Sequence, residues 1–219
     1  MGRLPRRPEW HLPLERLEPT ADGSGVRVRL GGRTLGTVEP GVPAALGLRV
    51  GELVPPQVQS ALERALAERA ACDAGVGMLA RRPYSAAQLE RALRLRHGTD
   101  AAAAAMVRLR VYLDDEAFAR TWAESRLRAG PRGAGVLTAG LRQAGVTRRQ
   151  ATAAVDVALE AAGGEPALCA AAARRWVARH GQPEGRAAVA RLWAHLARRG
   201  FSGDVIARAL AGTALETME

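Results

Sequence analysis

The chain has 219 residues and a mass of 23.2 kDa, and 47% of its residues are hydrophobic, which is typical of a folded protein with one large or two small domains. Its formal net charge is +10, from 32 basic and 22 acidic residues, and every basic residue is an arginine. The lack of lysine excludes a P-loop, a Schiff-base lysine and a Ser-x-x-Lys nucleophile.

Other catalytic and metal-binding patterns are also missing from the sequence. The histidines lack the spacing of a metal site, the two cysteines lie far apart, and the glycine-rich stretch at 130–140 follows no predicted strand. We therefore expect neither an enzyme nor a cofactor or metal. Apolar runs fall short of the ~18 residues of a membrane span, and the N-terminus lacks the apolar core of a signal peptide. We expect a cytoplasmic protein without a membrane partner.

The N-terminal quarter predicts a small region with a β-hairpin. Early prolines indicate that residues 1–21 form a flexible segment. The alternating segment VRVRL-GG-RTLGTV then predicts a hairpin within residues 22–56, whose two-residue loop places Val28 opposite Leu35. We expect residues 41–54 to cover this hairpin as a short helix and an extended stretch.

From Gln57 onward the apolar residues follow a helical period, and glycines and prolines divide the chain into about nine helices. Three windows in this part repeat the order helix, glycine, helix. The glycines, each expected to form a left-handed helix C-cap, are Gly98, Gly145 and Gly200. The expected N-caps of the following helices are Thr99, Thr147 and Ser202.

With the helix before each window, the repeating unit has three helices, and such units stack because one alone buries too little. We predict repeats at 57–112, 113–163 and 164–212, followed by a C-terminal tail at 213–219. The predicted fold is therefore mainly all-α, with tandem three-helix repeats in an elongated helical stack and a small N-terminal region that contains a β-hairpin.

The stretch VYLDDEAFARTWAESRLRAGPRG, residues 111–133, places three acids before a helix that ends in arginine. We expect Asp114 to cap this helix, and the acids and arginines at its two ends to complement the helix dipole. Arg120, Glu124 and Arg128 have the i,i+4 spacing of ion pairs.

The aromatic residues of the same stretch predict its packing. Phe118 and Trp122 lie one helical turn apart and are expected to form the buried stripe. Tyr112 and Leu113 precede the cap and are expected to fix the helix entrance onto the preceding unit. The stretch is thus interpreted as a rigid joint between repeats.

Several motifs between Leu79 and about Gly212 together resemble the bacterial regulatory protein RecX. They are LARRPYSAAQLERAL, YLDDEAFA, SRLRAGPRGAGVLTAGLRQAGV and LARRGFSGDVIARAL, and they extend over about 60% of the chain. The signature residues of this resemblance, which we interpret as mainly structural, are Tyr112, Leu113, Asp114, Asp115, Phe118 and Ala119.

The resemblance implies a non-enzymatic regulator of homologous recombination and DNA repair. Members of this family lie in the groove of the RecA filament on single-stranded DNA, where they inhibit its ATPase, strand exchange and coprotease activities. The implied partners are the RecA filament and single-stranded DNA, with duplex DNA as a further candidate. We expect the protein to act as a monomer.

Residues 125–155 contain no acid, which predicts a basic face for RecA or DNA, because arginine can hold a phosphate or carboxylate by two hydrogen bonds. The candidates in this block are Arg126, Arg128, Arg132, Arg142, Arg148 and Arg149. A second group comprises Arg174, Arg175, Arg198 and Arg199, and a third comprises Arg81, Arg82, Arg94 and Arg96. The alternative for each arginine is a solvated helix surface in a GC-rich genome.

Two other interpretations stay open. The segment LRQAGVTRRQATAAV is compatible with a helix-turn-helix DNA-binding transcriptional regulator, with Arg148 and Arg149 at the start of its recognition helix. A second copy of this shape at LARRGFSGDVIARAL favours repeats instead, since a transcription factor normally has one reading head per chain. A purely structural helical scaffold is the third class, but it would not need an acid-free arginine block.

Overall fold

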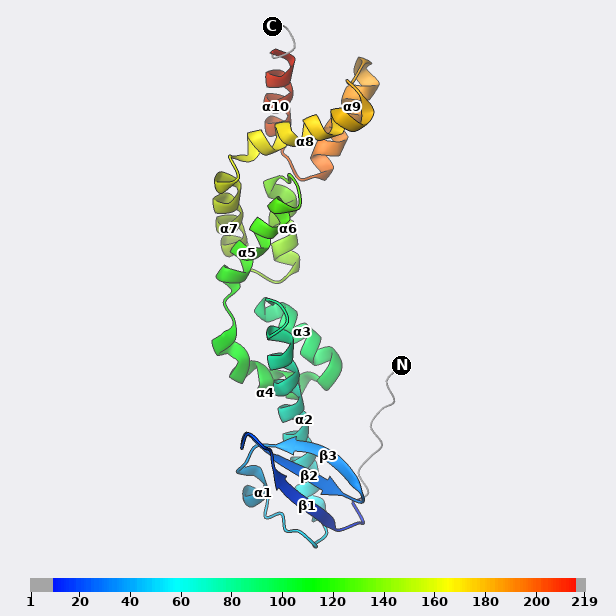
Figure 1. Ribbon diagram of the computed structural model, residues 1–219, viewed down its shortest axis with the longest axis vertical. Helices are drawn as coiled ribbons and strands as arrows, with labels where there is room; N and C mark the ends of the chain where they lie inside the picture. Colours follow the sequence, from blue (N-terminus) through cyan, green and yellow to red (C-terminus); the bar gives the residue numbers. More distant parts are fainter. Residues whose placement is uncertain (1–9, 216–219) are drawn as a thin grey trace. The chain divides into compact units, whose positions relative to one another are not determined.

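The computed structural model describes residues 10–215 and divides the chain into two compact units (Figure 1). The first unit comprises Met1–Arg82 and Leu89–Tyr112, and the second comprises Pro83–Gln88 and Leu113–Glu219. Parts of the predicted flexible segment and of the predicted tail lie outside the described residues.

The first unit begins with a three-stranded antiparallel sheet in the order β1-β2-β3. Its strands are β1 (Leu14–Pro19), β2 (Val26–Leu30) and β3 (Arg33–Val38). The predicted hairpin of β2 and β3 is confirmed, with its two loop glycines at φ +57° and +73°. The prediction of a flexible segment is wrong for β1, which pairs with β2. The prolines on which that prediction relied stand before the strand and at its last residue, where they remove no central ladder bond.

The register of the hairpin also differs from the prediction. Val28 pairs with Gly36 rather than with Leu35, because the register shifts between Val28 and Arg29. Arg29 pairs with Thr34, so Leu35 is the extra residue of a bulge. Gly36 adopts φ +151°, which a residue with a side chain rarely adopts.

A helical layer covers the sheet within this unit. The predicted short helix is α1 (Val42–Ala45), and the following segment returns to pair Leu53 with Pro13. The long helix α2 (Pro56–Leu79) then begins at the second of two prolines, as expected. The shared core contains Leu14, Val28, Leu30, Val38, Leu48, Val54 and Leu62.

Two arginines join the sheet region to the helices of the first unit. Arg69 of α2 donates to the Ser24 carbonyl at 2.6 Å and to Asp73 at 2.8 Å. Glu39, which follows β3, accepts from both Arg69 and Arg108. The sheet, α2, α4 (Thr99–Leu109) and the short 3-10 helix η1 (Arg110–Tyr112) belong to this unit with most of α3 (Ala86–His97), whereas residues 86–88 at the start of α3 belong to the second unit.

The predicted N-cap of α4 differs from the one in the structure. Gly98 alone separates α3 from α4 and has φ +83°, so it is itself the N-cap of α4. Thr99 is the first helical residue and does not cap the helix, in contrast to the prediction. This first copy of the repeat thus has a shorter connection than the other two.

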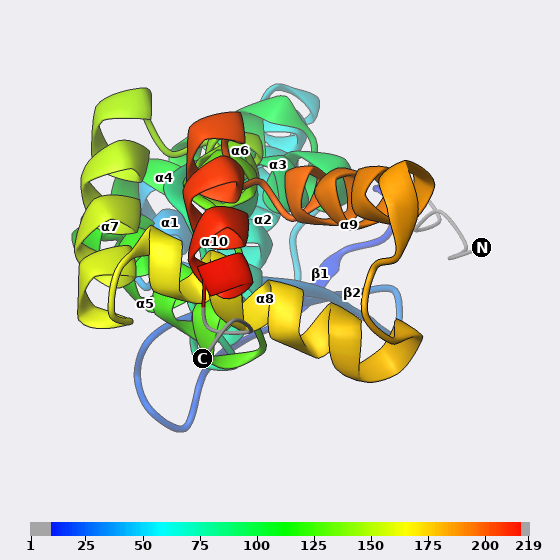
Figure 2. The same ribbon diagram turned by 90° about the horizontal axis from the view of Figure 1, so that it is seen from above.

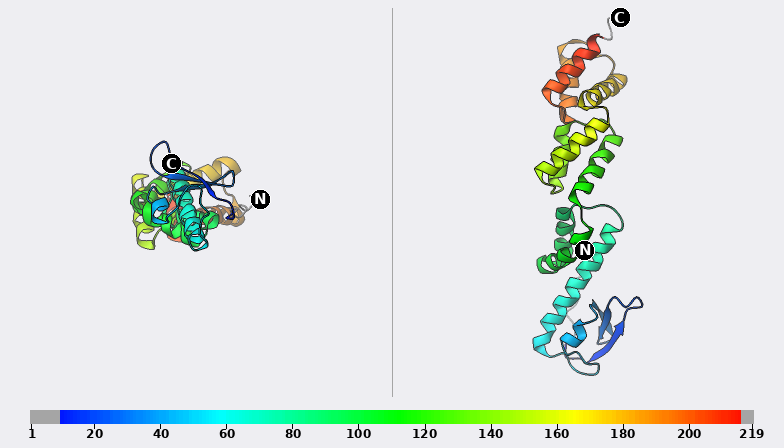
Figure 3. Two further views of the ribbon diagram at one scale, coloured as in Figure 1. Left: turned by 90° about the horizontal axis from the view of Figure 1, so that it is seen from below. Right: turned by 90° about the vertical axis from the view of Figure 1, so that its left-hand side faces the viewer.

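The second unit contains six helices in its described part. They are α5 (Asp115–Arg128), α6 (Ala134–Gln143), α7 (Arg148–Ala161), α8 (Glu165–His180), α9 (Gly185–Arg198) and α10 (Gly203–Leu215). With α2, α3 and α4, these are nine helices after residue 55 in the described chain, as predicted. Helices α5 to α7 share one core, and α10 packs on α8 in a second core (Figures 2 and 3).

The repeat prediction is confirmed at the turns of these two three-helix groups. Gly145 and Gly200 adopt φ +91° and +90°. In each turn the glycine N–H and the next N–H bond back to the helix end, which is the Schellman arrangement. Thr147 and Ser202 then cap α7 and α10 through their hydroxyl groups, at 3.4 Å in both cases.

Candidate functional site

The loop before α6 packs directly against the turn after α9. The Gly133 N–H donates to the Arg199 carbonyl at 2.9 Å, and the Gly135 N–H donates to the Gly200 carbonyl at 3.1 Å. A β-carbon on Gly133 would collide with the Gly200 carbonyl, so only glycine permits this approach. The contact fixes residues 130–135 beside the end of α9.

This contact brings three arginines together. The Arg199 Nη1 group donates to the Pro131 carbonyl at 2.9 Å, and its Nε donates to His195 Nε2 at 3.1 Å. Terminal nitrogens of Arg175 and Arg199 lie 3.3 and 4.0 Å from the position that a β-carbon on Gly130 would occupy. The nearby Arg132 has a buried Nε that finds no hydrogen-bond partner in the described chain. We call Arg132, Arg175 and Arg199 the arginine cluster.

The arginine cluster carries positive charge that forms no ion pair with a carboxylate in the described part of the chain. Among the described residues, none of its three members has a carboxylate oxygen within 4.0 Å. Burial lowers the pKa of Arg199, and the neighbouring Arg132, Arg175 and Arg179 lower it further. An arginine nevertheless stays protonated at neutral pH, so the cluster is electrostatically suited to an anion.

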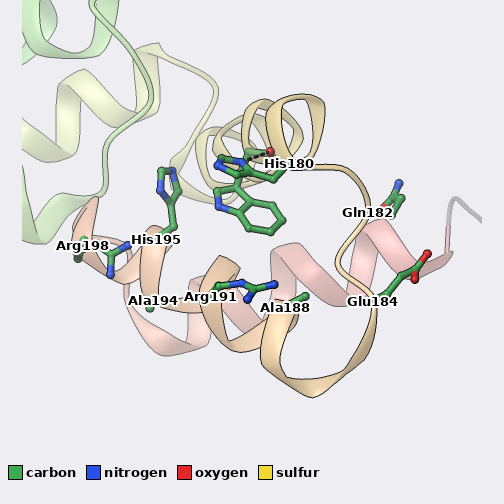
Figure 4. A pocket seen from close by; sticks show the side chains of 9 residues that line it. His180, Gln182, Glu184, Ala188, Arg191, Ala194, His195 and Arg198 are labelled. Atoms are coloured by element: carbon green, nitrogen blue, oxygen red, sulfur yellow. Dashed lines mark hydrogen bonds between the residues drawn. The ribbon is translucent and has the colours of Figure 1, made fainter.

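A cavity of about 610 Å³ opens beside the arginine cluster, between α8 and α9 (Figure 4). His195 belongs to both places, because it lines the cavity and accepts the hydrogen bond from Arg199. Trp176 and His180 stack with 4.6 Å between ring centroids, and the His180 Nδ1–H donates to the Trp176 carbonyl at 2.8 Å. Arg191 and Arg198 also line the cavity.

The surroundings of His195 lower its pKa and so favour its neutral form. Burial is the largest cause of its lowered pKa, followed by the positive charges of Arg199 and Arg198. A neutral imidazole can accept the Arg199 hydrogen bond at Nε2, which a doubly protonated ring cannot. The ring therefore helps to hold the Arg199 guanidinium in place.

The sequence grouped these residues differently. Arg132 was assigned to the acid-free block, and Arg175 and Arg199 to a second group, whereas the structure joins all three in one cluster. Arg126 instead lies 5.0 Å above the Trp122 ring, a cation–π contact. Apart from Arg132 and Arg199, the predicted arginines of the second unit are exposed: Arg126, Arg128, Arg142, Arg148, Arg149, Arg174, Arg175 and Arg198. Arg81, Arg94 and Arg96 are exposed in the first unit, which also contains Arg82.

The two aspartates of the signature have different partners. Asp114 caps α5 as expected, because its Oδ1 accepts from the N–H groups of Glu116 and Ala117, both at 2.9 Å. Asp115 Oδ1 instead accepts from the Ala86 N–H at 2.8 Å, at the start of α3. Residues 83–88 and Asp115 lie in the same unit, so this bond is internal to it.

The bond of Asp115 recurs in the next repeat. Glu165, the first residue of α8, accepts from the Ala134 N–H at 2.8 Å, at the start of α6. In both cases an acid at the first position of one repeat caps the second helix of the repeat before it. The sequence shows an acid at the first position of two helices, Asp115 and Glu165, but it does not predict the backbone N–H groups to which they bind.

Two expectations for the stretch 111–133 are wrong. Tyr112 is 70% exposed and does not fix the helix entrance. The i,i+4 spacing of Arg120, Glu124 and Arg128 yields no ion pair within 4.0 Å among the described residues, and all three side chains are exposed on α5. Phe118 is buried as expected.

The buried stripe of α5 also contains small side chains. Trp122 is only half-buried, and the fully buried Ala119 and Ala123 complete the stripe beside Phe118.

No helix in the described part of the chain is long and apolar enough to cross a membrane. The same residues contain no group of three or more His, Cys, Asp or Glu side chains that could hold a metal ion.

The fold and the site define a tandem three-helix repeat protein with an uncompensated arginine cluster. The second three-helix domain of RecX matches residues 114–155, and the third three-helix domain of RecX matches residues 166–210. The chain therefore belongs to the RecX family.

Solved structures share this fold. A crystal structure of regulatory protein RecX matches with a TM-score of 0.64 and 20% identity, over 89% of this chain and 96% of the other. RecX from Lactobacillus salivarius matches with a TM-score of 0.59 and 17% identity, over 68% of this chain and 97% of the other. No curated protein sequence matches the chain.

Proposed function

We propose that this protein is a non-enzymatic regulator of homologous recombination and DNA repair that binds the RecA filament on single-stranded DNA. Bound there, it inhibits the ATPase, strand exchange and coprotease activities of RecA. The observation that carries the proposal is the pair of consecutive RecX domains in residues 114–210. The protein acts in the cytoplasm, as a monomer and without a cofactor.

The charge of the second and third repeats supports this proposal. A RecA filament on DNA offers both phosphate groups and acidic side chains, and the arginine cluster has neither type of partner within its own described chain. Rigid contacts such as that between Gly133 and Arg199 fix the spacing of the arginines across two repeats. Such fixed spacing favours binding to regularly spaced anionic groups over binding to a single flexible anion.

The ATPase rate of RecA on single-stranded DNA, measured as this protein is titrated in, tests the proposal. A parallel binding assay on the DNA alone at the same salt concentration provides the control. We expect hydrolysis to fall at fewer regulator molecules than RecA subunits, while free DNA is mostly unbound. Unchanged hydrolysis, or a fall that occurs only when the DNA is coated, would contradict the proposal.

The helix-turn-helix alternative predicts a different result. Arg148 and Arg149 are exposed at the start of α7, as a recognition helix would require. The same turn geometry recurs between α9 and α10, which favours a repeat over a single reading head. Footprinting on duplex DNA distinguishes the two, because a filament regulator protects no defined operator.

A further inference from the structure

Two guanidinium groups of the arginine cluster, those of Arg175 and Arg199, converge beside Gly130. Arg175 and Arg199 approach the same point at 3.3 and 4.0 Å, although one lies on α8 and the other follows α9. Arg132 enters from the loop before α6 and is near enough to act electrostatically on Arg199. Like charges held this close repel each other, and a bound anion would remove that repulsion.

The hydrogen-bond donors of the cluster are only partly used. Arg199 is held by two bonds, to the Pro131 carbonyl and to His195, so its position does not depend on a ligand. The buried Nε of Arg132 has no hydrogen-bond partner among residues 10–215. Because an unsatisfied buried donor is costly, its position predicts an acceptor that the free chain does not supply. Guanidinium groups from three segments suit the several oxygens of a phosphate group.

The adjoining cavity indicates what is attached to this phosphate. It has about 610 Å³, which is within the ~300–1,000 Å³ of small-molecule sites, and it begins at His195 (Figure 4). Its wall combines the exposed His180 ring, which stacks on the largely buried Trp176, with Arg191, and Glu184 is its single acid among the lining residues. A nucleoside can occupy a cavity with this lining, whereas a free phosphate ion would not fill the cavity.

We infer that the arginine cluster binds one backbone phosphate of a single-stranded nucleic acid, with the neighbouring nucleoside at the cavity. This inference rests on the proposed function, since it assigns a ligand to the surface that would face the filament. Its test contains no RecA, so failure to bind a strand and failure to inhibit RecA are separate results.

The test compares two double variants of the full chain. Arg132→Gln with Arg175→Gln alters the cluster without removing a bond of Arg199. Arg148→Gln with Arg149→Gln removes the same charge from exposed positions on α7 and is the matched control. Binding of a fluorescent oligothymidylate is measured by anisotropy over a series of salt concentrations, after thermal denaturation has shown that each variant is folded.

We expect the cluster variant to lose roughly tenfold or more in affinity, because charge-assisted hydrogen bonds are lost. Its salt slope should fall by about 0.7 for each phosphate contact removed, since a single strand releases about that many counterions per contact. The control variant should lose clearly less in both quantities. Equal losses in the two variants, or none in the cluster variant, would overturn the inference.

Two competitors identify the source of the anion. Inorganic phosphate, matched in ionic strength with chloride, should displace the strand only at high concentration, because it lacks the nucleoside. Polyglutamate should compete more weakly than an unlabelled oligothymidylate of equal charge. Stronger competition by polyglutamate would assign the cluster to an acidic protein surface, and tight binding of phosphate alone would assign it to the free ion. Either result would overturn the assignment to nucleic acid.

Discussion

Replacement of Gly133 by alanine tests whether the loop before α6 determines the geometry of the arginine cluster. Gly133 has φ −87°, a conformation that alanine adopts without strain, so the backbone itself does not require glycine. The obstacle is the Gly200 carbonyl, which lies where the new methyl group would be. The variant therefore isolates the close approach of two backbone segments.

The expected loss follows from the contacts of this loop. Overpacking costs about 1–3 kcal/mol, and displacement of the loop weakens two backbone hydrogen bonds, each contributing about 1 kcal/mol. The reduced entropy of the unfolded alanine chain offsets about 0.4–1 kcal/mol. We expect Gly133→Ala to lower the free energy of unfolding by about 2–4 kcal/mol.

Urea denaturation measures this loss, with the denaturation midpoint as the readout. Gly203→Ala is the matched control, because a β-carbon there meets only the Trp193 ring at 3.7 Å, an ordinary contact. The control should change stability by less than about 1 kcal/mol. If Gly133→Ala were as stable as the unaltered protein, the close approach would not hold the two repeats together.

Two further predictions concern individual side chains. Asp115→Ala should lower the free energy of unfolding by about 1–2 kcal/mol, because the Ala86 N–H loses its acceptor. Asp115→Asn should recover part of this loss. Equal stability of all three proteins in urea denaturation would contradict the role of Asp115 as a cap. The pKa of His195 is lowered below its ordinary 6.5, so the unfolded chain binds the proton more readily and stability should fall as the pH drops below 6.5. His195→Gln should flatten this part of the stability profile, and an unchanged profile would show that His195 does not cause it.

The helices could be predicted from the sequence because their limits depend on local chemistry. Gly145 and Gly200 end their helices in the left-handed conformation, and Thr147 and Ser202 cap the next ones, all within a few residues. Strand β1 was missed for a different reason. Its pairing with β2 is a tertiary contact, and it outweighs the local preference that the prolines indicated.

The site could be predicted only in part. The arginines were identified by their charge, but Arg132 and Arg199 are far apart in sequence, and their meeting depends on backbone contacts of Gly133 and Gly135. No charge pattern encodes that contact. His195 and Trp176 were not predicted as site residues because an isolated histidine or tryptophan has no motif, and only the packing of α8 against α9 gives them a shared cavity.

The two aspartates of the YLDD stretch show why a motif can have two functions. Asp114 satisfies its own helix, and Asp115 satisfies the start of α3, so neither can replace the other. Glu165 has the role of Asp115 at the next joint, where Ala134 begins α6. A carboxylate at the first position of α5 or α8 therefore caps the start of the helix two before it, and substitutions of Asp115 should affect the start of α3 more than helix α5 itself.

The arginine cluster is costly for the free protein. Arg199 is partly buried among like charges, and the buried Arg132 Nε has no acceptor among the residues that the structure describes. Both features lower the stability of the unbound chain. A phosphate in the cluster would relieve both at once. Ligand binding should consequently raise the stability of the two repeats as well as hold the ligand, because an anion that binds only the folded state shifts the folding equilibrium toward it.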